Sequence, residues 1–181
     1  MNTSKMVRIS DFCTTGSGGT PARQNARYYR NGTIPWVKSG ELREDIINNA
    51  EEFITFDALK ETSVKMVPKN SLLLAMYGAT VGRLAILGIP ATTNQAICHI
   101  IPNAKVAEVR YLFHALRAQV EYIISQGVGG AQPNINQSIV KNLEVRLPSL
   151  EEQRRTIELL DKSEDLKVKR INAIGKINLL I

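Results

Sequence analysis

The feature that most constrains the fold is the last segment of the chain, which has the pattern of one long helix. Pro148 ends a β-like stretch, Ser149 is a residue type that caps helices, and two glutamates follow in the first expected turn. The helical pattern runs from Glu151 to Ile181, 31 residues, or roughly 46 Å if unbroken. A helix of this length needs a surface that covers its apolar side.

The apolar positions of this segment form a drifting stripe. Ile157, Leu160, Ile171 and Ile174 fall on the a and d positions of one heptad frame, whereas Val168 lies outside it. The stripe is therefore closer to an 11-residue repeat than to a strict heptad. The helix either folds back on its own domain or packs against another long helix, and we favour coiled-coil-type packing against another helix.

The preceding residues indicate a mixed α/β fold of the α+β class. We expect a globular domain over residues 1–148, with a twisted, mainly antiparallel β-sheet and flanking helices, and then the helix over residues 149–181. The expected strands are Met6–Ile9, Thr33–Lys38, Ser63–Val67, Leu72–Met76, Leu84–Leu87, Ala96–Ile101 and Leu143–Leu147. The expected helices are Asp57–Glu61, capped by Asp57, Val106–Gln126 and Gln137–Lys141, and Thr14–Pro21 is expected to be a turn-rich loop.

Composition indicates an ordinary globular protein. Hydrophobic residues make up 44% of the chain and charged residues 22%, which allows a core and argues against disorder. The longest apolar run, Leu72–Tyr77, is too short to span a membrane, and no apolar signal segment follows the N-terminus. Cys13 and Cys98 are too few for a disulfide scaffold, so we expect reduced thiols in a cytoplasmic protein.

Charge is distributed unevenly along the chain. Of a net charge of +6, residues 1–40 carry +5, residues 41–62 carry −5 and residues 63–149 carry +5. A basic excess of this kind suits a polyanionic partner. Because phosphates repel carboxylates, we expect the basic stretches to share one face and the acidic stretch to point away from it.

Motifs for catalysis are missing from the sequence. It contains no Gly-x-Gly-x-x-Gly after a strand and no Gly-x-x-x-x-Gly-Lys-Ser/Thr, and neither His99 nor His114 has metal-ligand spacing. Asp161 with Asp165 and Lys167 resembles a nuclease site, but we expect these residues on the solvated face of the last helix. We therefore expect a binding protein with no catalytic residue, no cofactor and no metal.

Six motifs, in order along almost the whole chain, resemble the specificity subunit of type I restriction–modification systems. Each is weak alone, and their common order makes the match strong. The motifs cover residues 18–21 (Gly-Gly-Thr-Pro), 32–42 with Tyr29 ahead of them, 73–83, 93–96 (Thr-Asn-Gln-Ala), 130–135 and 147–153 (Leu-Pro-Ser-Leu-Glu-Glu-Gln).

This resemblance implies a function. Such a subunit has two target-recognition domains in tandem, each followed by a long helix, and the two helices pack antiparallel as a spacer. The present chain is similar to one such unit, with a recognition domain over residues 1–148 and a dimerisation or spacer helix over 149–181. The resemblance implies double-stranded DNA, a methyltransferase subunit and a restriction subunit as partners, and no membrane.

The resemblance also directs attention to loop residues that fit base edges or phosphates. Arginine suits guanine, asparagine and glutamine suit adenine, and lysine suits phosphate. The candidate DNA-binding residues are Thr20, Arg23, Gln24, Arg27, Lys38, Ser39, Tyr77, Thr80 and Arg83. Structural roles compete with these: residues 18–21 suit a backbone turn, Trp36 suits the core, and Asn94 and Gln95 suit amides that tie loops together.

Three functions stay open at this point. The leading one is a DNA-recognition subunit that reads half of a bipartite target and pairs through Ile157, Leu160, Ile171 and Ile174. Its partner is a second copy of the chain or another half-length subunit. The alternative is an assembly or regulatory protein that holds the methyltransferase through its helix without reading DNA. A self-contained DNA-modifying enzyme is disfavoured by the missing cofactor and metal motifs.

Overall fold

The centre of the fold is a five-stranded sheet with the strand order β2-β9-β6-β7-β4. The computed structural model describes residues 5–43, 45–128 and 134–178. The sheet contains β2 (Cys13–Ser17), β9 (Ile97–Pro102), β6 (Ser71–Ala75), β7 (Leu84–Leu87) and β4 (Ile46–Ile47). Neighbouring strands are antiparallel except β4 and β7, which are parallel. The expected α+β class, with a mainly antiparallel sheet, is confirmed.

Strand β6 is buried on both faces of the sheet. Because successive side chains of a strand point to opposite faces, Leu72 and Leu74 join one core cluster and Leu73 and Ala75 join another. The first cluster is closed by α3 (Val109–Arg117) and α4 (Val120–Ser125). These two helices therefore cover one face of the sheet.

A three-stranded sheet with the order β5-β3-β8 contributes to the other face. Its strands are β3 (Ile34–Val37), β5 (Glu52–Ile54) and β8 (Thr92–Thr93). Val37 packs with Leu73 and Ala75 of the central sheet. On the far side of β3, Trp36 and Ile54 form a separate cluster with residues on and next to α2 (Phe56–Glu61).

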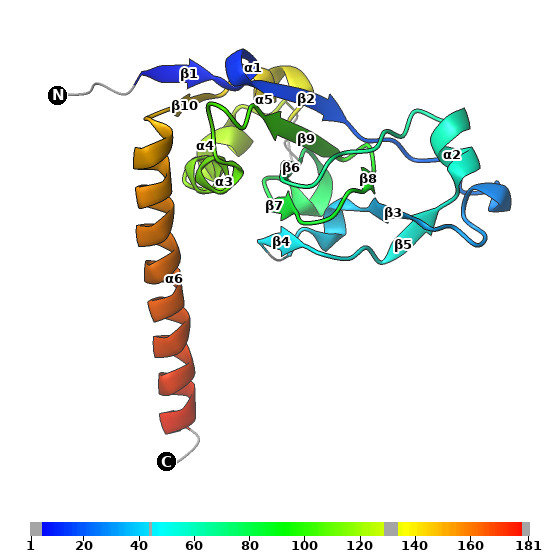
Figure 1. The fold of residues 1–181 in the computed structure, drawn as a ribbon. Coiled ribbons are helices and arrows are strands. Elements are labelled where there is room, and N and C mark those ends of the chain that lie inside the picture. Colours follow the sequence, from blue (N-terminus) through cyan, green and yellow to red (C-terminus); the bar gives the residue numbers. More distant parts are fainter. Residues whose placement is uncertain (1–4, 44, 129–133, 179–181) are drawn as a thin grey trace.

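The N-terminal part of the chain lies beside the root of the last helix. Strand β1 (Met6–Arg8) pairs with β10 (Glu144–Arg146), near α1 (Ile9–Phe12) and α5 (Gln137–Asn142). Helix α6 (Leu150–Asn178) then runs away from the domain past α3 (Figure 1). Ser149 and Glu152 exchange hydrogen bonds at its start, which confirms the expected cap. No helix within the described residues combines the length and apolarity needed to cross a bilayer.

The expected helix over Val106–Gln126 is wrong in its extent. The chain forms α3 and α4 instead, and Gln119 between them has φ −111° and ψ 9°. The break lets Ile123 reach the core while Val120 and Ile124 pack over Gly82. The helical spacing of apolar residues alone does not show such a break, because the apolar sides of both short helices face the same core.

Three shorter expectations are also wrong. Ser63–Val67 is not a strand: only Val67 forms an isolated bridge, with Ala91. Helix α2 is capped by Thr55, whose hydroxyl accepts from the Ala58 amide, and not by Asp57. The stretch expected as a loop from Thr14 contains β2. Its Gly16 allows close approach of the His99 ring, which a Cβ at Gly16 would meet at 2.4 Å.

Candidate nucleic-acid interface

One end of the five-stranded sheet gathers the loops that carry most of the six motifs. Strands β2 and β6 finish there and β9 and β7 begin there, because Ser17 pairs with Cys98 and Leu74 with Leu84. The loop after β2, the turn after β6 and the segment before β9 therefore lie together. Residues distant in sequence are placed at one edge by strand pairing alone.

Main-chain hydrogen bonds tie these loops to one another. The Gly19 amide donates to the Thr93 carbonyl at 2.9 Å, and the Asn94 amide donates to the Val37 carbonyl at 2.9 Å. A Cβ at Gly18 would lie 2.2 Å from the Thr93 carbonyl oxygen, so this close approach needs glycine. The motifs at residues 18–21, 32–42 and 93–96 thus form one rigid unit.

The motif at residues 73–83 is bonded to the same unit. The Met76 amide donates to the Ala96 carbonyl at 2.7 Å, and the Ile135 amide donates to the Met76 carbonyl at 2.8 Å. Residues 130–133 of the fifth motif lie outside the described residues, but Ile135 attaches its end to this edge. Five of the six motifs therefore contribute to one edge of the sheet.

The structural interpretations of Trp36 and Gln95 fit the observed positions, whereas the side-chain oxygen of Asn94 is buried with no hydrogen-bond partner among the described residues. Trp36 is 1% exposed, and its indole N–H donates to the Gly19 carbonyl at 3.0 Å. Thr20, on the exposed side of the same turn, donates its hydroxyl hydrogen bond to the side-chain oxygen of Gln95. Trp36 thus belongs to the core below the loops, and the Thr20–Gln95 pair lies on the surface above it.

The expected separation of acidic and basic stretches is wrong in this part of the fold. Arg23 and Lys38 both pair with Glu52, at 2.5 and 2.7 Å, and Arg27 pairs with Asp57 and Glu61. For Arg23 and Lys38 the cause is strand pairing: β5 lies antiparallel to β3, with Glu52 opposite Trp36, which brings this carboxylate beside the basic loop. The partners of Arg27 lie on α2, which follows β5. Three cations expected at DNA therefore have carboxylate partners.

Glu52 is the centre of this ion-pair cluster. Hydrogen bonds from Arg23 and then from Lys38 lower the pKa of its carboxyl to about 2. The Arg23 guanidinium also stacks over Tyr29 and Trp36, with 4.9 and 4.7 Å from its central carbon to the ring centroids. Arg23 is thus held by a carboxylate and two rings, with about half of its side chain still exposed (52%).

The remaining candidates lie on exposed turns of the same edge. Tyr77 is half-buried, which raises the pKa of its phenol, and precedes the 3₁₀ turn η3 (Gly78–Thr80). Gly78 has φ +75° with open space beyond its Cα, so the turn leaves room for a ligand to approach closely. Gln24 is exposed, and Ser39 is half-buried in the turn η2 (Ser39–Glu41).

Arg83 differs from the other predicted arginines because, among the described residues, its guanidinium has no carboxylate partner. It is exposed at the start of β7 and shares a shallow hollow with Arg43. The Nε of Arg43 donates to the Gly40 carbonyl at 2.9 Å. Sequence reasoning missed Arg43, because this residue lies inside the acidic stretch 41–62, whose net charge is negative.

The sixth motif has a different role, at the root of α6. The buried side chain of Gln153 accepts from the Glu108 amide at 2.9 Å and donates to the carbonyls of Val106 and Pro148. Asp161, expected on a solvated face, instead pairs with Arg110 at 2.9 Å. The expectation is wrong for Asp161 because α3 packs against this part of α6, whereas Asp165 and Lys167 are exposed as expected.

His114 belongs to the same ion-pair cluster, with its Nε2 3.1 Å from Asp161. Burial is the main cause of its lowered pKa. The side chains of His114, Asp161 and Glu164 come within 4.8 Å of one another, as metal ligands do. However, Arg110 and Arg117 already pair with the two carboxylates. We therefore assign these side chains to ion pairs and not to a metal.

The candidate pairing residues of α6 have different exposures. Ile157 is half-buried, whereas Leu160, Ile171 and Ile174 are 39%, 58% and 51% exposed. The outer part of the helix thus keeps an open apolar stripe. The proximal part of the stripe, at Ile157, is half-covered within the chain.

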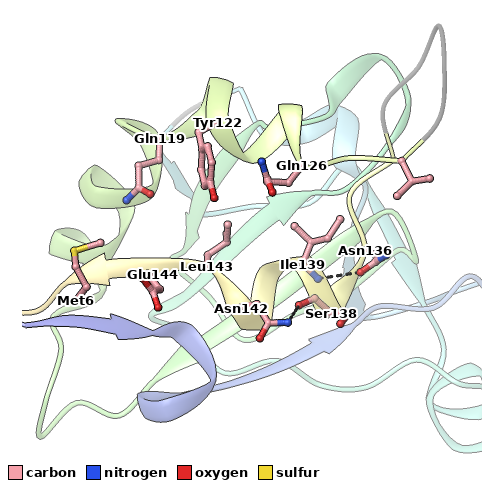
Figure 2. A pocket seen from close by; sticks show the side chains of 11 residues that line it. Met6, Gln119, Tyr122, Gln126, Asn136, Ser138, Ile139, Asn142, Leu143 and Glu144 are labelled. Carbon is pink, nitrogen blue, oxygen red and sulfur yellow. Dashed lines mark hydrogen bonds between the residues drawn. The ribbon is translucent and has the colours of Figure 1, made fainter.

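A separate hollow of about 550 Å³ lies between α4 and α5 (Figure 2). Gln119, Tyr122 and Gln126 line one side, and Asn142 lies on the other. Of its lining residues that the structure describes, only Glu144 is charged at neutral pH, and a carboxylate repels phosphate. This hollow contains none of the predicted DNA-binding residues.

Comparison with known proteins gives the family of the chain. The family described as "Type I restriction modification DNA specificity domain" matches residues 1–176. The specificity subunit of the type I restriction enzyme EcoR124I/EcoR124II from Escherichia coli is 27% identical over 154 residues, 82% of this chain and 38% of that protein. The MjaIX specificity subunit from Methanocaldococcus jannaschii is 32% identical over 163 residues, 88% of this chain and 37% of that protein.

Solved structures show the same fold. The HsdS subunit from Thermoanaerobacter tengcongensis matches with a TM-score of 0.73 and 17% identity, over 94% of this chain and 40% of that one. A chain from a study of complex assembly and conformational transition of the type I R-M system matches with a TM-score of 0.77 and 18% identity. That match covers 99% of this chain and 43% of the other. The chain thus spans about two fifths of the length of its relatives.

Proposed function

The chain belongs to the family of type I restriction modification DNA specificity domains, and we propose that it reads one half of a bipartite DNA target for a methyltransferase. It does so with the edge of the sheet at which the motif loops meet. Residues 1–148 form the recognition domain, and residues 149–181 the helix that pairs and spaces two such domains.

The observation that carries this proposal is the rigid assembly of loops at one sheet edge. A recognition surface must hold its side chains in fixed register on the duplex. The bonded motif loops supply that rigidity, and the exposed turn around Gly78 leaves room for the sugar–phosphate backbone. The guanidinium of Arg83, which has no carboxylate partner among the described residues, offers a fork of donors that suits guanine O6 and N7.

The predicted side chains divide into readers and positioners. Arg83 and Gln24 read base edges, whereas Ser39, Tyr77, Thr80 and Thr20 contact the backbone or bases from the exposed turns. Arg23, Arg27 and Lys38 can contact DNA only after their ion pairs with carboxylates have broken. Lys38 then positions a phosphate, because an ammonium is a point charge without base specificity.

Family membership supports the proposed partners and reaction. We expect the chain itself to contribute no catalytic group, and a methyltransferase subunit to supply methyl transfer. A restriction subunit joins the same assembly for cleavage. All of them work on duplex DNA in the cytoplasm, and the chain requires no cofactor or metal of its own.

The exposed apolar stripe of α6 supplies the contact with a second recognition domain. Leu160, Ile171 and Ile174 pack against the helix of a second copy or of another half-length subunit, and Ile157 lies at the inner end of this seam. Two-fold pairing is the commonest assembly of soluble proteins. Antiparallel helices would hold the two domains at opposite ends, so two copies would read inverted half-sites.

Salt-dependent binding to duplex DNA tests the proposal, with and without the methyltransferase subunit. A recognition subunit prefers a target sequence, and the Arg83→Ala variant weakens this preference. An assembly protein that only holds the methyltransferase binds that subunit with no preference among DNA sequences. The second outcome would replace DNA recognition by the assembly role.

A further inference from the structure

Up to residue 174, where the described side chains of α6 end, this helix is docked on the domain only along its first half. Gln153 is fully buried, Arg154 pairs with Glu108 at 2.8 Å, and Asp161 and Glu164 pair with α3. Beyond Glu164, every described side chain up to residue 174 is exposed, and none forms a hydrogen bond or ion pair with the domain. The direction of the whole helix is therefore set by this proximal half.

The docked residues lie on one stripe of α6. Gln153, Ile157, Asp161 and Glu164 follow one another at spacings of four, four and three, which places them on one helix face. The stripe begins with a buried amide, continues with a half-buried isoleucine and ends with two carboxylates. Its last two members are the farthest from Pro148, where the domain joins the helix. Contacts at this distance restrict the direction of the helix more than contacts close to Pro148.

Helix α3 supplies a matching stripe of nitrogen groups. Arg110 and Arg117 lie four residues before and three residues after His114, on one face of α3. Arg110 holds Asp161 through two nitrogens at 2.9 and 3.1 Å, and Arg117 pairs with Glu164. Two carboxylates on one helix thus face two guanidiniums on the other.

Two further groups complete the cluster. His114, with a side chain 5% exposed, lies with its Nε2 3.1 Å from Asp161 and its Nδ1 3.2 Å from Arg117. This geometry suits a neutral imidazole that donates to the carboxylate and accepts from the guanidinium. Asp45, just before β4, lies 3.5 Å from Arg110 and 3.7 Å from Arg117. The cluster therefore joins α6 and α3 to the edge strand of the central sheet.

We infer that the side chains of Arg110, His114, Arg117, Asp161 and Glu164 fix the angle between the recognition domain and α6, and thereby the number of base pairs between the two half-sites. These residues are positioning residues and touch no DNA. The inference rests on the proposed function, because a half-site spacing exists only for a protein that reads two half-sites.

A small change of angle is enough to matter. A domain of this size has a radius of gyration of roughly 15 Å, so its recognition edge lies on the order of 20 Å from the joint between the domain and α6. A rotation of about 10° then moves this edge by about 3.5 Å, close to the roughly 3.4 Å rise of one base pair. A joint that is loose by 10° would accept spacings one base pair longer or shorter.

The first test measures the joint directly, without DNA. Nitroxide labels at Lys60→Cys on α2 and Lys169→Cys on α6 report the domain–helix distance by pulsed electron paramagnetic resonance. Labelled protein is diluted in an excess of unlabelled protein, so that only distances within one chain are seen. Burial raises the pKa of the native thiols Cys13 and Cys98 to about 12, which disfavours the reactive thiolate, and a labelling reaction on the protein without the two introduced cysteines checks that neither is modified.

The variant is Asp161→Asn with Glu164→Gln, and the matched control is Glu158→Gln with Asp165→Asn. The control changes two exposed carboxylates of the same helix that have no ion-pair partner among the described residues. We expect a narrow distance distribution in the unchanged protein and the control, and a clearly broader one in the variant. Equal widths in all three would overturn the inference.

The second test measures methylation by the assembled enzyme. Its DNA substrates carry the native half-sites at the native spacing, or with one base pair more or fewer. We expect the unchanged protein and the control to prefer the native spacing by about tenfold or more, since a wrong spacing misplaces the base contacts of one half-site. The variant is expected to lose most of this preference while it recognises the same half-site sequences.

The two tests separate the possible failures. A broadened joint with unchanged spacing preference would overturn the link between the cluster and the spacing. Methylation with no sequence preference in the unchanged protein would contradict the proposed function instead, and the resonance result would then stand on its own as a property of the joint.

Discussion

The carboxylate of Glu52 accepts hydrogen bonds from two nitrogens of the Arg23 guanidinium, at 2.5 and 3.3 Å. The Lys38 ammonium donates to the same carboxylate at 2.7 Å. The carboxylate of Glu52 thus forms ion pairs with two of the cations that were expected to contact DNA. Before these cations can bind phosphate or a base, they must leave Glu52, so this residue limits how strongly the surface attracts any duplex.

The Glu52→Gln variant should bind non-specific duplex DNA more tightly and with a steeper salt dependence. It frees Arg23 and Lys38, and each new phosphate contact adds about 0.9 to the slope of log affinity against log salt. Fluorescence anisotropy at several salt concentrations measures both quantities. Glu158→Gln on α6 is the matched control and should change neither, and an unchanged slope in Glu52→Gln would show that the two cations do not reach DNA.

Readers and positioners should respond differently to substitution. Arg83→Ala should lose discrimination at one base position, at a cost of about 1–3 kcal/mol. Lys38→Ala should weaken binding to all sequences alike and flatten the salt slope. Binding measured on a set of single-base variants of the target separates the two effects. A uniform loss for Arg83→Ala would assign this residue to phosphate.

Substitution of Arg23 and of Arg27 tests whether their ion pairs prevent the reading of bases that the sequence predicts for them. If either arginine leaves its carboxylates to read a base, its alanine variant loses preference at one position. If its role is structural, the variant keeps its sequence preference but melts at a lower temperature, because Arg23 also stacks on Tyr29 and Trp36. We expect base discrimination to fall in both variants. Full target preference and affinity in both would contradict their placement in the interface.

The stability of the fold should depend on Glu52 at low pH. Its folded pKa of about 2 lies below the ordinary value of 4.5, so its pairing stabilises the fold fully above pH 4.5 and is lost as the pH falls toward 2. The difference in melting temperature between the unchanged protein and Glu52→Gln should therefore shrink over this window. A difference that is constant with pH would contradict the ion pairs with Arg23 and Lys38.

The outer stripe of α6 should be needed for pairing. Ile171→Glu places a charge in the seam and should shift the protein to monomers and abolish methylation by the assembled enzyme. Asn172→Glu adds the same charge about 100° around the helix and is the matched control. Sedimentation velocity measures the assembly state. An intact dimer in Ile171→Glu would exclude this stripe as the seam.

Local patterns were sufficient for much of the fold. The apolar runs of β6, β7 and β9 and the turns between them predicted the positions of these strands to within one or two residues, and the Ser149–Glu152 cap predicted the start of α6. The break at Gln119 and the missing strand at Ser63–Val67 were not predictable in the same way. They depend on packing against residues distant in sequence, such as Gly82 and Ala91.

The candidate interface was predictable as a set of loops but not as a set of contacts. The motif residues mark positions where two segments of the backbone approach each other closely, such as Gly18 against Thr93. These close approaches bring the loops together. The ion pairs of Arg23, Lys38 and Asp161 depend on which strand or helix lies next to which. Charge summed along the sequence does not contain that information.

The most direct test of the central claim is the DNA motif that the enzyme methylates when this chain is its sole specificity subunit. Genomic DNA from cells that express it with a methyltransferase subunit is sequenced with detection of methylated bases. Two copies paired through α6 predict an interrupted palindrome, with the same half-site inverted at a fixed spacing. An asymmetric bipartite motif would contradict the pairing of two copies, and methylation without any sequence preference would contradict DNA recognition by this chain.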